Sequence, residues 1–176
     1  VETALKAAES GHTVISTIHA DTAIQTLERL RSFMPVERAR SSTYTLSQQI
    51  RAILNQRLIR TLCHSCCRKK TAGEVLDADK IAKLELDPLD VVHLQNEEGC
   101  DLCNRTGILG RTLLLEALLI DTPLSQRDPI FHALVDNVND VARQDGVTYY
   151  RRLDNLKSLV QEGLIDPHNA LNQLDE

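Results

Sequence analysis

The sequence predicts an α/β protein that carries a small metal-binding module, and three observations lead to this prediction. The first 62 residues follow the order helix, strand, helix, helix, strand, which is typical of α/β folds. Two C-x-x-C motifs come after them, and 176 residues suffice for one ordinary domain with a small module. Apolar residues make up 42% of the chain, so a core can form, but aromatic residues are only 3%. The core must therefore be built from Leu, Ile, Val and Ala.

Local signals divide the N-terminal part into elements. Gly11 fits the position after a helix end, and Asp21 or Thr22 fits a helix N-cap. A β-branched run between them indicates a buried strand. The segments expected here are helices over 2–10, 22–32 and 36–54 and strands over 12–17 and 58–62.

The C-terminal part is less uniform. Residues 71–99 are acidic, and a short helix is expected over 78–84. Residues 111–120 are so apolar that periodicity fits a strand or a helix, and the turn residues on both sides favour the strand. Further helices are expected over 124–135, 138–144 and 149–162, and a last helix begins with Asp166 as cap and Pro167 at its first position.

The two C-x-x-C pairs carry the clearest chemical signal. Cys63 and Cys66 form the first pair, and Cys100 and Cys103 form the second. Together they supply the four thiolates of a tetrahedral zinc site. Two disulfides or unrelated thiols are the alternative, which the lack of any sign of secretion disfavours. Cys67 is expected not to be a ligand, because Cys66 already completes the two-residue spacing.

The charge of the chain argues against a general nucleic-acid binder. The formal net charge is −5. A basic cluster beside the first cysteine pair invites a phosphate-binding interpretation, with a solvated positive rim as the alternative. The acidic segment that follows disfavours nucleic acid, and no apolar run is long enough to span a membrane. The cluster consists of Arg57, Arg60, Arg68, Lys69 and Lys70.

Two histidines bracket the first predicted strand. A strand of that length separates His12 from His19 by about 20 Å, so the two cannot share a metal ion there. His19 follows the strand, where α/β proteins place ligand-binding groups. A hydrogen-bonded structural histidine is the alternative for His19.

Several motifs occur together in a fixed order. They are Gly11-His12-Thr-Val-Ile-Ser-Thr-Ile-His19, Arg29-Leu30, Gln56-Arg57-Leu58, Leu62-Cys63-x-x-Cys66, Gly99-Cys-Asp-Leu-Cys103, Gly107-x-x-Gly110-Arg111 and Glu116. In this order they resemble the type II secretion and type IV pilus assembly ATPases over essentially the whole chain. The resemblance implies the C-terminal portion of a RecA-like P-loop domain, followed by a four-cysteine zinc module and a small helical domain. The boundaries expected are 1–62, 63–110 and 111–176.

The same resemblance implies roles for particular residues. In that family the stretch around the two histidines is called the His box, so His19 is the candidate for contact with the nucleotide phosphates and His12 is supporting. Arg29 is implied as a nucleotide contact, and Arg57 and Arg60 are implied to make subunit or nucleotide contacts. The family's usual Thr-Asn-Asp is replaced here by Ala20-Asp21-Thr22, which is a departure.

A larger departure concerns the phosphate cradle. A P-loop needs G-x-x-x-x-G-K-[ST], and none of the seven glycines is followed by Lys. We therefore expect a fragment that does not hydrolyse ATP alone. The whole protein is implied to be a hexamer that uses ATP and Mg²⁺ to drive pilin or pseudopilin assembly, with an inner-membrane platform protein as partner and no nucleic acid. A stand-alone zinc-dependent interaction or nucleic-acid module is the alternative.

Overall fold

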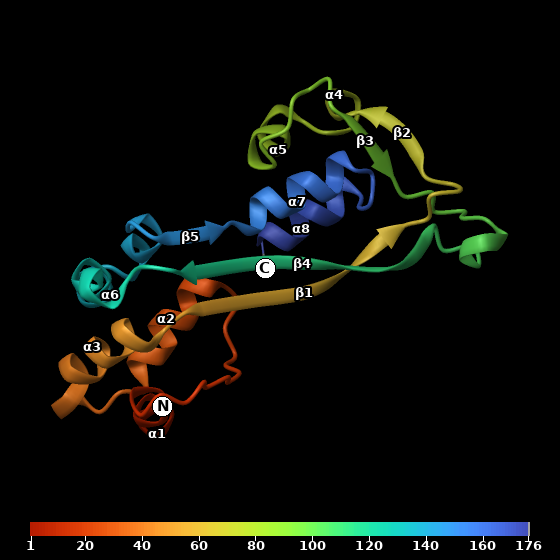
Figure 1. Ribbon diagram of the computed structural model, residues 1–176. Coiled ribbons are helices and arrows are strands. Elements are labelled where there is room, and N and C mark those ends of the chain that lie inside the picture. Colours follow the sequence, from red (N-terminus) through yellow and green to blue (C-terminus); the bar gives the residue numbers. More distant parts are fainter. Residues whose placement is uncertain (176) are drawn as a thin grey trace. The chain divides into compact units, whose positions relative to one another are not determined.

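The computed structural model describes residues 1–175 and divides the chain into two compact units, each made of two segments. Unit 1 comprises Val1–Asn55 and Glu116–Tyr150, and unit 2 comprises Gln56–Leu115 and Arg151–Glu176. Helices and strands alternate as the sequence predicted, so the α/β class is confirmed. Two long strands, β1 and β4, contribute residues to both units (Figure 1).

Unit 1 surrounds part of a three-stranded sheet with the order β1-β4-β5. β4 and β5 are antiparallel, with Ala117 opposite Tyr150 and Ile120 opposite Val147. The helices and strands of this unit are α1 (Glu2–Glu9), α2 (Ala23–Ser32), η1 (Val36–Arg38), α3 (Ala39–Gln49), the start of β1 (Ala52–Leu62), the end of β4 (Ile108–Ile120), η3 (Leu124–Gln126), α6 (Asp128–Asp136), η4 (Val138–Arg143) and β5 (Val147–Tyr150).

The core of unit 1 is aliphatic, as the composition predicted. α2 begins at the N-cap Thr22, whose hydroxyl accepts the backbone N–H of Gln25 at 3.0 Å. Its Leu27 is fully buried. Because apolar side chains at spacings of three and four share one helical face, α2 presents Ile24, Leu27 and Leu30 to the same cluster. The cluster also contains Met34, Leu46, Ile53, Leu118, Ile120, Ile130, Leu134, Val138 and Val141.

A buried arginine in unit 1 donates hydrogen bonds to several backbone carbonyl groups. Arg127 is only 1% exposed. Three of its contacts are the C-terminal carbonyls of α3 and the residue after it, groups that no helical N–H satisfies. Its guanidinium donates to the carbonyl oxygens of Thr122 (2.9 Å), Ser47 (2.9 Å), Gln48 (3.1 Å), Ile50 (2.7 Å) and Ile120 (3.2 Å).

Unit 2 combines a two-stranded sheet with two C-terminal helices. β2 and β3 are antiparallel, with Arg68 opposite Leu94 and Thr71 opposite Val91. The elements of this unit are the end of β1, β2 (Arg68–Thr71), α4 (Ala72–Val75), α5 (Ala78–Lys83), β3 (Val91–Leu94), η2 (Asp101–Cys103), the start of β4, α7 (Arg152–Gln161) and α8 (Pro167–Asp175).

The core of unit 2 is separate from that of unit 1. Ile59 of β1 and Leu114 of β4 pack with Val92 of β3 and with residues of both C-terminal helices. The cluster contains Ile59, Ala72, Leu76, Ile81, Leu84, Leu86, Val92, Leu114, Leu156, Leu159, Val160, Ile165, Ala170 and Leu171.

His93 lies at the edge of this core with an unsatisfied nitrogen. Its ring packs directly on the turn after α7, where a Cβ at Gly163 would come within 2.3 Å of Nδ1. Nδ1 is buried and has no hydrogen-bond partner among the described residues. Burial, and secondarily the positive charge of Lys69, lower the pKa of His93 from its ordinary value.

Four sequence predictions need correction. Residues 12–17 are not a strand: they form no regular element and pair with no strand in the described chain, and Ile15 is 92% exposed. The helix expected over 36–54 ends at Gln49, because Ile50 takes an extended conformation and β1 begins at Ala52. The helix expected over 138–144 is one residue shorter and of the 3-10 type, η4 (Val138–Arg143).

The fourth correction concerns the helix expected over 149–162. Its beginning belongs to β5, and the helix α7 starts only at Arg152. The run Val147-Thr-Tyr-Tyr150 is β-branched and aromatic, which suits a strand that pairs with β4. The hairpin of β2 and β3 was not predicted. By contrast, the strand over 111–120 and the helices over 2–10, 22–32 and 78–84 are confirmed to within three residues.

Replacing Arg127 is expected to destabilise unit 1. Arg127→Met leaves several buried carbonyl groups without a donor, and the free energy of unfolding should fall by about 3 kcal/mol or more. All three tyrosines of the chain lie in unit 1, so tyrosine fluorescence during urea denaturation reports on it. Arg143→Met is the matched control, because the Arg143 side chain is 79% exposed and forms a surface ion pair with Asp140. Equal effects of the two substitutions would refute the role given to Arg127.

His93 is expected to make unit 2 less stable in acid. Because its folded-state pKa is depressed, the unfolded chain binds the proton more readily, and stability is lost as the pH falls below the ordinary histidine value of 6.5. His93→Leu removes this titration. Thermal unfolding by circular dichroism, from pH 7.5 to 5.5 with excess zinc throughout, should therefore show a smaller fall in Tm for the variant than for the wild type. Parallel pH profiles would contradict the assignment.

Candidate functional site

The four cysteines of the two C-x-x-C pairs come together at one point of unit 2. Cys63 follows the last residue of β1, and Cys66 lies three residues on in a tight turn. Cys100 and Cys103 bracket the short 3-10 helix η2, which precedes β4. The four Sγ atoms all lie within 4.8 Å of one another. Two pairs that are 37 residues apart in sequence are thus brought together by the ends of neighbouring strands.

The spacing of the sulfur atoms fits a tetrahedral ion. Zinc–sulfur bonds of about 2.3 Å require the corners of the tetrahedron to be about 3.8 Å apart. The Sγ separations are 3.8 Å for Cys63–Cys100, 3.9 Å for Cys66–Cys103 and 3.8 Å for Cys100–Cys103. None of the cysteines is in a disulfide. The four thiols are positioned to bind a metal ion, as the sequence predicted.

Backbone N–H groups surround the Cys103 sulfur. Sγ of Cys103 accepts from the N–H of Cys100 at 3.2 Å and from that of Gly107 at 3.1 Å. Gly107 has φ +70°, and a Cβ there would lie 2.2 Å from the carbonyl oxygen of Asn96. Only glycine allows this approach, and the Gly107 carbonyl also accepts the N–H of Cys63 at 2.8 Å. The glycine therefore links the two cysteine pairs.

The protonation of the thiols in the metal-free fold is uneven. Burial, with the sulfur contacts to Cys63, Cys100 and Cys103, raises the pKa of Cys66 to about 12. The backbone N–H of Cys100, helped by that of Gly107, lowers the pKa of Cys103 to about 6 despite the opposing effect of burial. Near neutral pH Cys66 therefore carries a proton that a bound metal ion must displace.

The fifth cysteine stands apart from the cluster. Cys67 is not among the thiols that converge, and its Sγ lies 3.8 Å from the carbonyl oxygen of His64. Two of its basic neighbours are engaged: Arg68 donates to Asn96 Oδ1 at 3.0 Å, and Lys70 pairs with Glu74 at 3.3 Å.

The second candidate site is the loop that carries His19 in unit 1. The His19 side chain is exposed, and its backbone carbonyl accepts from the Arg29 guanidinium. The carbonyl of Ala20 accepts from the side-chain amide of Asn55 at 2.9 Å. Arg29, which the sequence singled out, thus contacts the backbone of the His19 loop.

A buried carboxylate holds the other end of this loop. Glu116 of β4 is only 2% exposed, and its Oε1 accepts the backbone N–H of Ala23 at 3.1 Å and the hydroxyl of Tyr149 at 2.7 Å. Ala23 is the first residue of α2, so the carboxylate satisfies one of the free N–H groups at the helix start. Sequence reasoning noted Glu116 only in a motif and missed Asn55 and Tyr149, since nothing local links them to the loop.

The remaining sequence candidates lie elsewhere. His12 is exposed, and its Nδ1 lies 2.9 Å from the Ser10 hydroxyl. Arg57 is a β1 residue of unit 2, whereas His12, His19 and Arg29 belong to unit 1.

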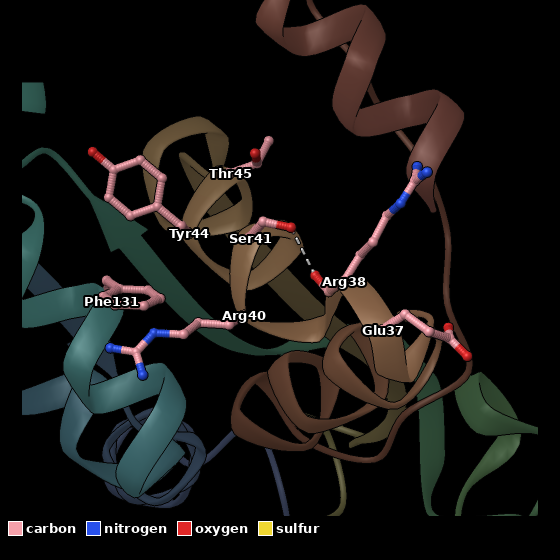
Figure 2. A pocket seen from close by; sticks show the side chains of 7 residues that line it. All are labelled: Glu37, Arg38, Arg40, Ser41, Tyr44, Thr45 and Phe131. Atoms are coloured by element: carbon pink, nitrogen blue, oxygen red, sulfur yellow. Dashed lines mark hydrogen bonds between the residues drawn. The ribbon is translucent and has the colours of Figure 1, made fainter.

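A shallow pocket of about 630 Å³ in unit 1 offers no convergent chemistry. Arg40 lies over the ring of Phe131 at 5.8 Å, and Tyr44 meets that ring edge-on at 5.4 Å. Figure 2 shows that the charged ends of Glu37, Arg38 and Arg40 point in different directions. The pocket therefore lacks the facing polar groups that a catalytic site needs. Within the described chain no helix has both the length and the apolar character that crossing a bilayer requires.

Comparisons with known proteins agree on one family. Residues 1–170 match the family described as Type II/IV secretion system protein. The type II secretion system protein E of Aeromonas hydrophila is 37% identical over 119 residues, which cover 67% of this chain and 22% of that protein. The type IV pilus assembly ATPase PilB of Thermus thermophilus is 29% identical over 98% of this chain and 17% of its own length.

Two further matches extend the comparison. The protein transport protein HofB homolog of Escherichia coli is 31% identical over 99% of this chain and 33% of that protein. The crystal structure of the pilus retraction motor PilT with bound ADP superposes with a TM-score of 0.57 at 22% identity, covering 98% of this chain and 35% of that one. The chain thus spans between 17% and 33% of the length of these sequence relatives.

The cysteine geometry predicts which thiols bind metal. Cys66→Ser removes one corner of the tetrahedron and is expected to lower the bound metal of freshly purified, reduced protein well below one equivalent. Cys67→Ser is the matched control one residue away, and it should keep the wild-type content. Elemental analysis by mass spectrometry measures both. Equal losses in the two variants would show that Cys67 is a ligand.

Proposed function

We propose that this chain, which belongs to the type II/IV secretion system protein family, forms the C-terminal part of a motor ATPase for secretion or pilus assembly. The observation that carries the proposal is the family match over residues 1–170, together with the His19 loop and the four-cysteine centre in one chain. Residues 1–62 would complete a RecA-like core, 63–110 would form a zinc module, and 111–176 would add a strand and a helical part.

Zinc is the metal we propose for the four-cysteine centre. A set of four thiolates with tetrahedral spacing favours zinc over harder ions, which prefer oxygen ligands. Cys63, Cys66, Cys100 and Cys103 would hold it, and the N–H groups of Cys100 and Gly107 would fix the orientation of one ligand. The bound ion would have a structural role, because four protein ligands leave no open position for a substrate.

For nucleotide chemistry we propose His19 as the residue that contacts the phosphates. Its side chain is exposed while its backbone is held by Arg29, a combination that presents an imidazole from a fixed loop. His12 would support this segment, and Arg29 and Arg57 would assist nucleotide or subunit contacts. ATP and Mg²⁺ would be bound mainly by parts of the protein outside this chain, since the chain contains no P-loop motif.

The setting we propose follows from the family. The whole protein would be a hexamer on the cytoplasmic face of the inner membrane of a bacterium. It would act with an inner-membrane platform protein and other secretion or pilus components, and drive pilin or pseudopilin assembly.

The proposal predicts a paired outcome for His19→Ala. The isolated chain should show no ATP turnover above background, because phosphoryl transfer needs a phosphate cradle, a Mg²⁺ site and a positioned water. In the full-length protein, His19→Ala should reduce kcat by roughly a hundredfold with a smaller change in nucleotide affinity, because a contact made mostly in the transition state is lost.

Release of phosphate and binding of a fluorescent ATP analogue would measure the two effects. His12→Ala is the matched control, and its loss of turnover should be smaller. Turnover by the isolated chain would refute the fragment proposal, and an unchanged kcat in the full-length variant would leave His19 with only a structural role.

A further inference from the structure

Hydrogen bonds fix only one side of the loop that contains His19. Residues 13–18, which precede it, form no hydrogen bond within the described part of the chain, and Ile15 is 92% exposed. From His19 to Ala23, by contrast, every residue takes part in one. The bonded groups are the carbonyls of His19 and Ala20, the N–H groups of Asp21 and Ala23 and the hydroxyl of Thr22.

The partners of this bonded stretch are of two kinds. Gln25 and Arg29 belong to α2, so their bonds tie the loop to the helix that follows it. Asn55 belongs to β1 and Glu116 to β4, so their bonds tie it to strands far away in sequence. Asn55 and Glu116 therefore fix the loop with respect to the sheet of unit 1.

Of these two strand residues, Asn55 makes the contact nearer to His19. Its side-chain amide donates to the carbonyl oxygen of Ala20 at 2.9 Å. Ala20 directly follows His19, and the peptide bond between the two residues is planar and nearly rigid. The bond from Asn55 therefore constrains the backbone from which the imidazole projects.

Glu116 is oriented by two donors on one oxygen. Its Oε1 accepts the N–H of Ala23 at 3.1 Å and the hydroxyl of Tyr149 at 2.7 Å. Both Glu116 and Ala23 are buried, and a carboxylate at the start of a helix is favoured by the helix dipole. Tyr149 thus orients the carboxylate, and the carboxylate fixes the first residue of α2.

The fixed stretch begins at an exposed imidazole. Ordering a surface loop costs conformational entropy, and burying a carboxylate costs hydration, so neither is favourable by itself. Here both are spent on the backbone next to His19, whose side chain remains exposed. A group that acts in a reaction is more effective when its position is set before the substrate binds.

We propose that Asn55, Glu116 and Tyr149 are positioning residues, which act on ATP turnover through His19. The proposal rests on the role proposed above for His19. None of the three residues touches the nucleotide: Asn55 sets the backbone next to the imidazole, and Glu116 with Tyr149 sets the start of α2. Loss of any of them should therefore lower kcat and leave nucleotide affinity nearly unchanged.

Single substitutions in the full-length protein test this split. Asn55→Ala should lower kcat roughly tenfold, while the affinity for a fluorescent ATP analogue changes less than about twofold. Tyr149→Phe should lower kcat less, because Tyr149 acts on the loop only through Glu116. Asn137→Ala is the matched control: its side chain accepts the N–H of Asn139 at 3.2 Å, within η4 of the same unit, and its loss should leave kcat unchanged.

A double-mutant cycle tests whether the effect passes through His19. Introduced into His19→Ala, Asn55→Ala should lower kcat by less than about twofold, because a positioning residue has nothing left to position once the imidazole is gone. A general loss of stability would instead lower kcat equally in both backgrounds.

Hydrogen exchange gives a readout that does not depend on activity. Glu116→Ala removes the acceptor of the Ala23 N–H, so exchange of that amide should become faster, as measured by mass spectrometry on a peptide that contains it. Glu116→Gln keeps a side-chain oxygen that can accept, and it should restore most of the protection and of kcat. The Asn55 cycle remains decisive even where Glu116→Ala does not fold.

The possible failures are distinguishable. Additive losses from Asn55→Ala and His19→Ala would overturn the positioning role alone, and so would equal effects of Asn55→Ala and Asn137→Ala. A loss of nucleotide affinity in place of kcat would overturn it as well. An unchanged kcat in His19→Ala would instead overturn the role proposed for His19, and the positioning role with it.

Discussion

Convergence of four thiols is the constraint on which unit 2 depends. Cys63 follows the last residue of β1, and Cys103 with Gly107 leads into β4, so the cluster fixes the point at which these two strands meet. The chain between the cysteine pairs is not a plain loop: it forms β2, β3 and two short helices with their own buried leucines. Such a small core, next to four mutually close sulfur atoms, would gain much of its stability from the ion proposed there. Burial, together with this close approach of the sulfur atoms, also raises the pKa of Cys66.

Unit 1 depends instead on two charged side chains that form hydrogen bonds with buried backbone groups. Arg127 satisfies carbonyls at the end of α3 and at the end of β4, and Glu116 satisfies the start of α2. Both charged side chains are almost fully buried, and both bond to the backbone of segments far away in sequence. Such contacts fix where helices begin and end with respect to the strands. An aliphatic cluster alone would define these helix positions less closely, because the packing of leucine and isoleucine side chains is not directional, whereas a hydrogen bond is.

Signals confined to a few neighbouring residues were sufficient to predict much of this architecture. The C-x-x-C spacing, the cap at Thr22 and the proline at position 167 each act locally, so the cysteine cluster and several helix starts could be predicted. The strand over 12–17 failed because pairing requires a partner that local sequence does not reveal. The β2–β3 hairpin escaped notice because Arg68-Lys-Lys-Thr71 is polar on both faces. The supports of the His19 loop, Asn55 and Glu116, could not be derived, since only the fold brings them near.

The way the His19 loop is held explains how its sequence can depart from the family pattern. Its contacts use backbone atoms: the carbonyl of Ala20 bonds to Asn55, the N–H of Asp21 to Gln25 at 3.0 Å, and the N–H of Ala23 to Glu116. The side chain at position 20 contributes none of these three bonds, so Ala20 leaves them intact. The position of His19 is then set by β1, β4 and α2. A change in the path of either strand would move the imidazole, and under the role proposed for His19 it would also alter the contact with phosphate.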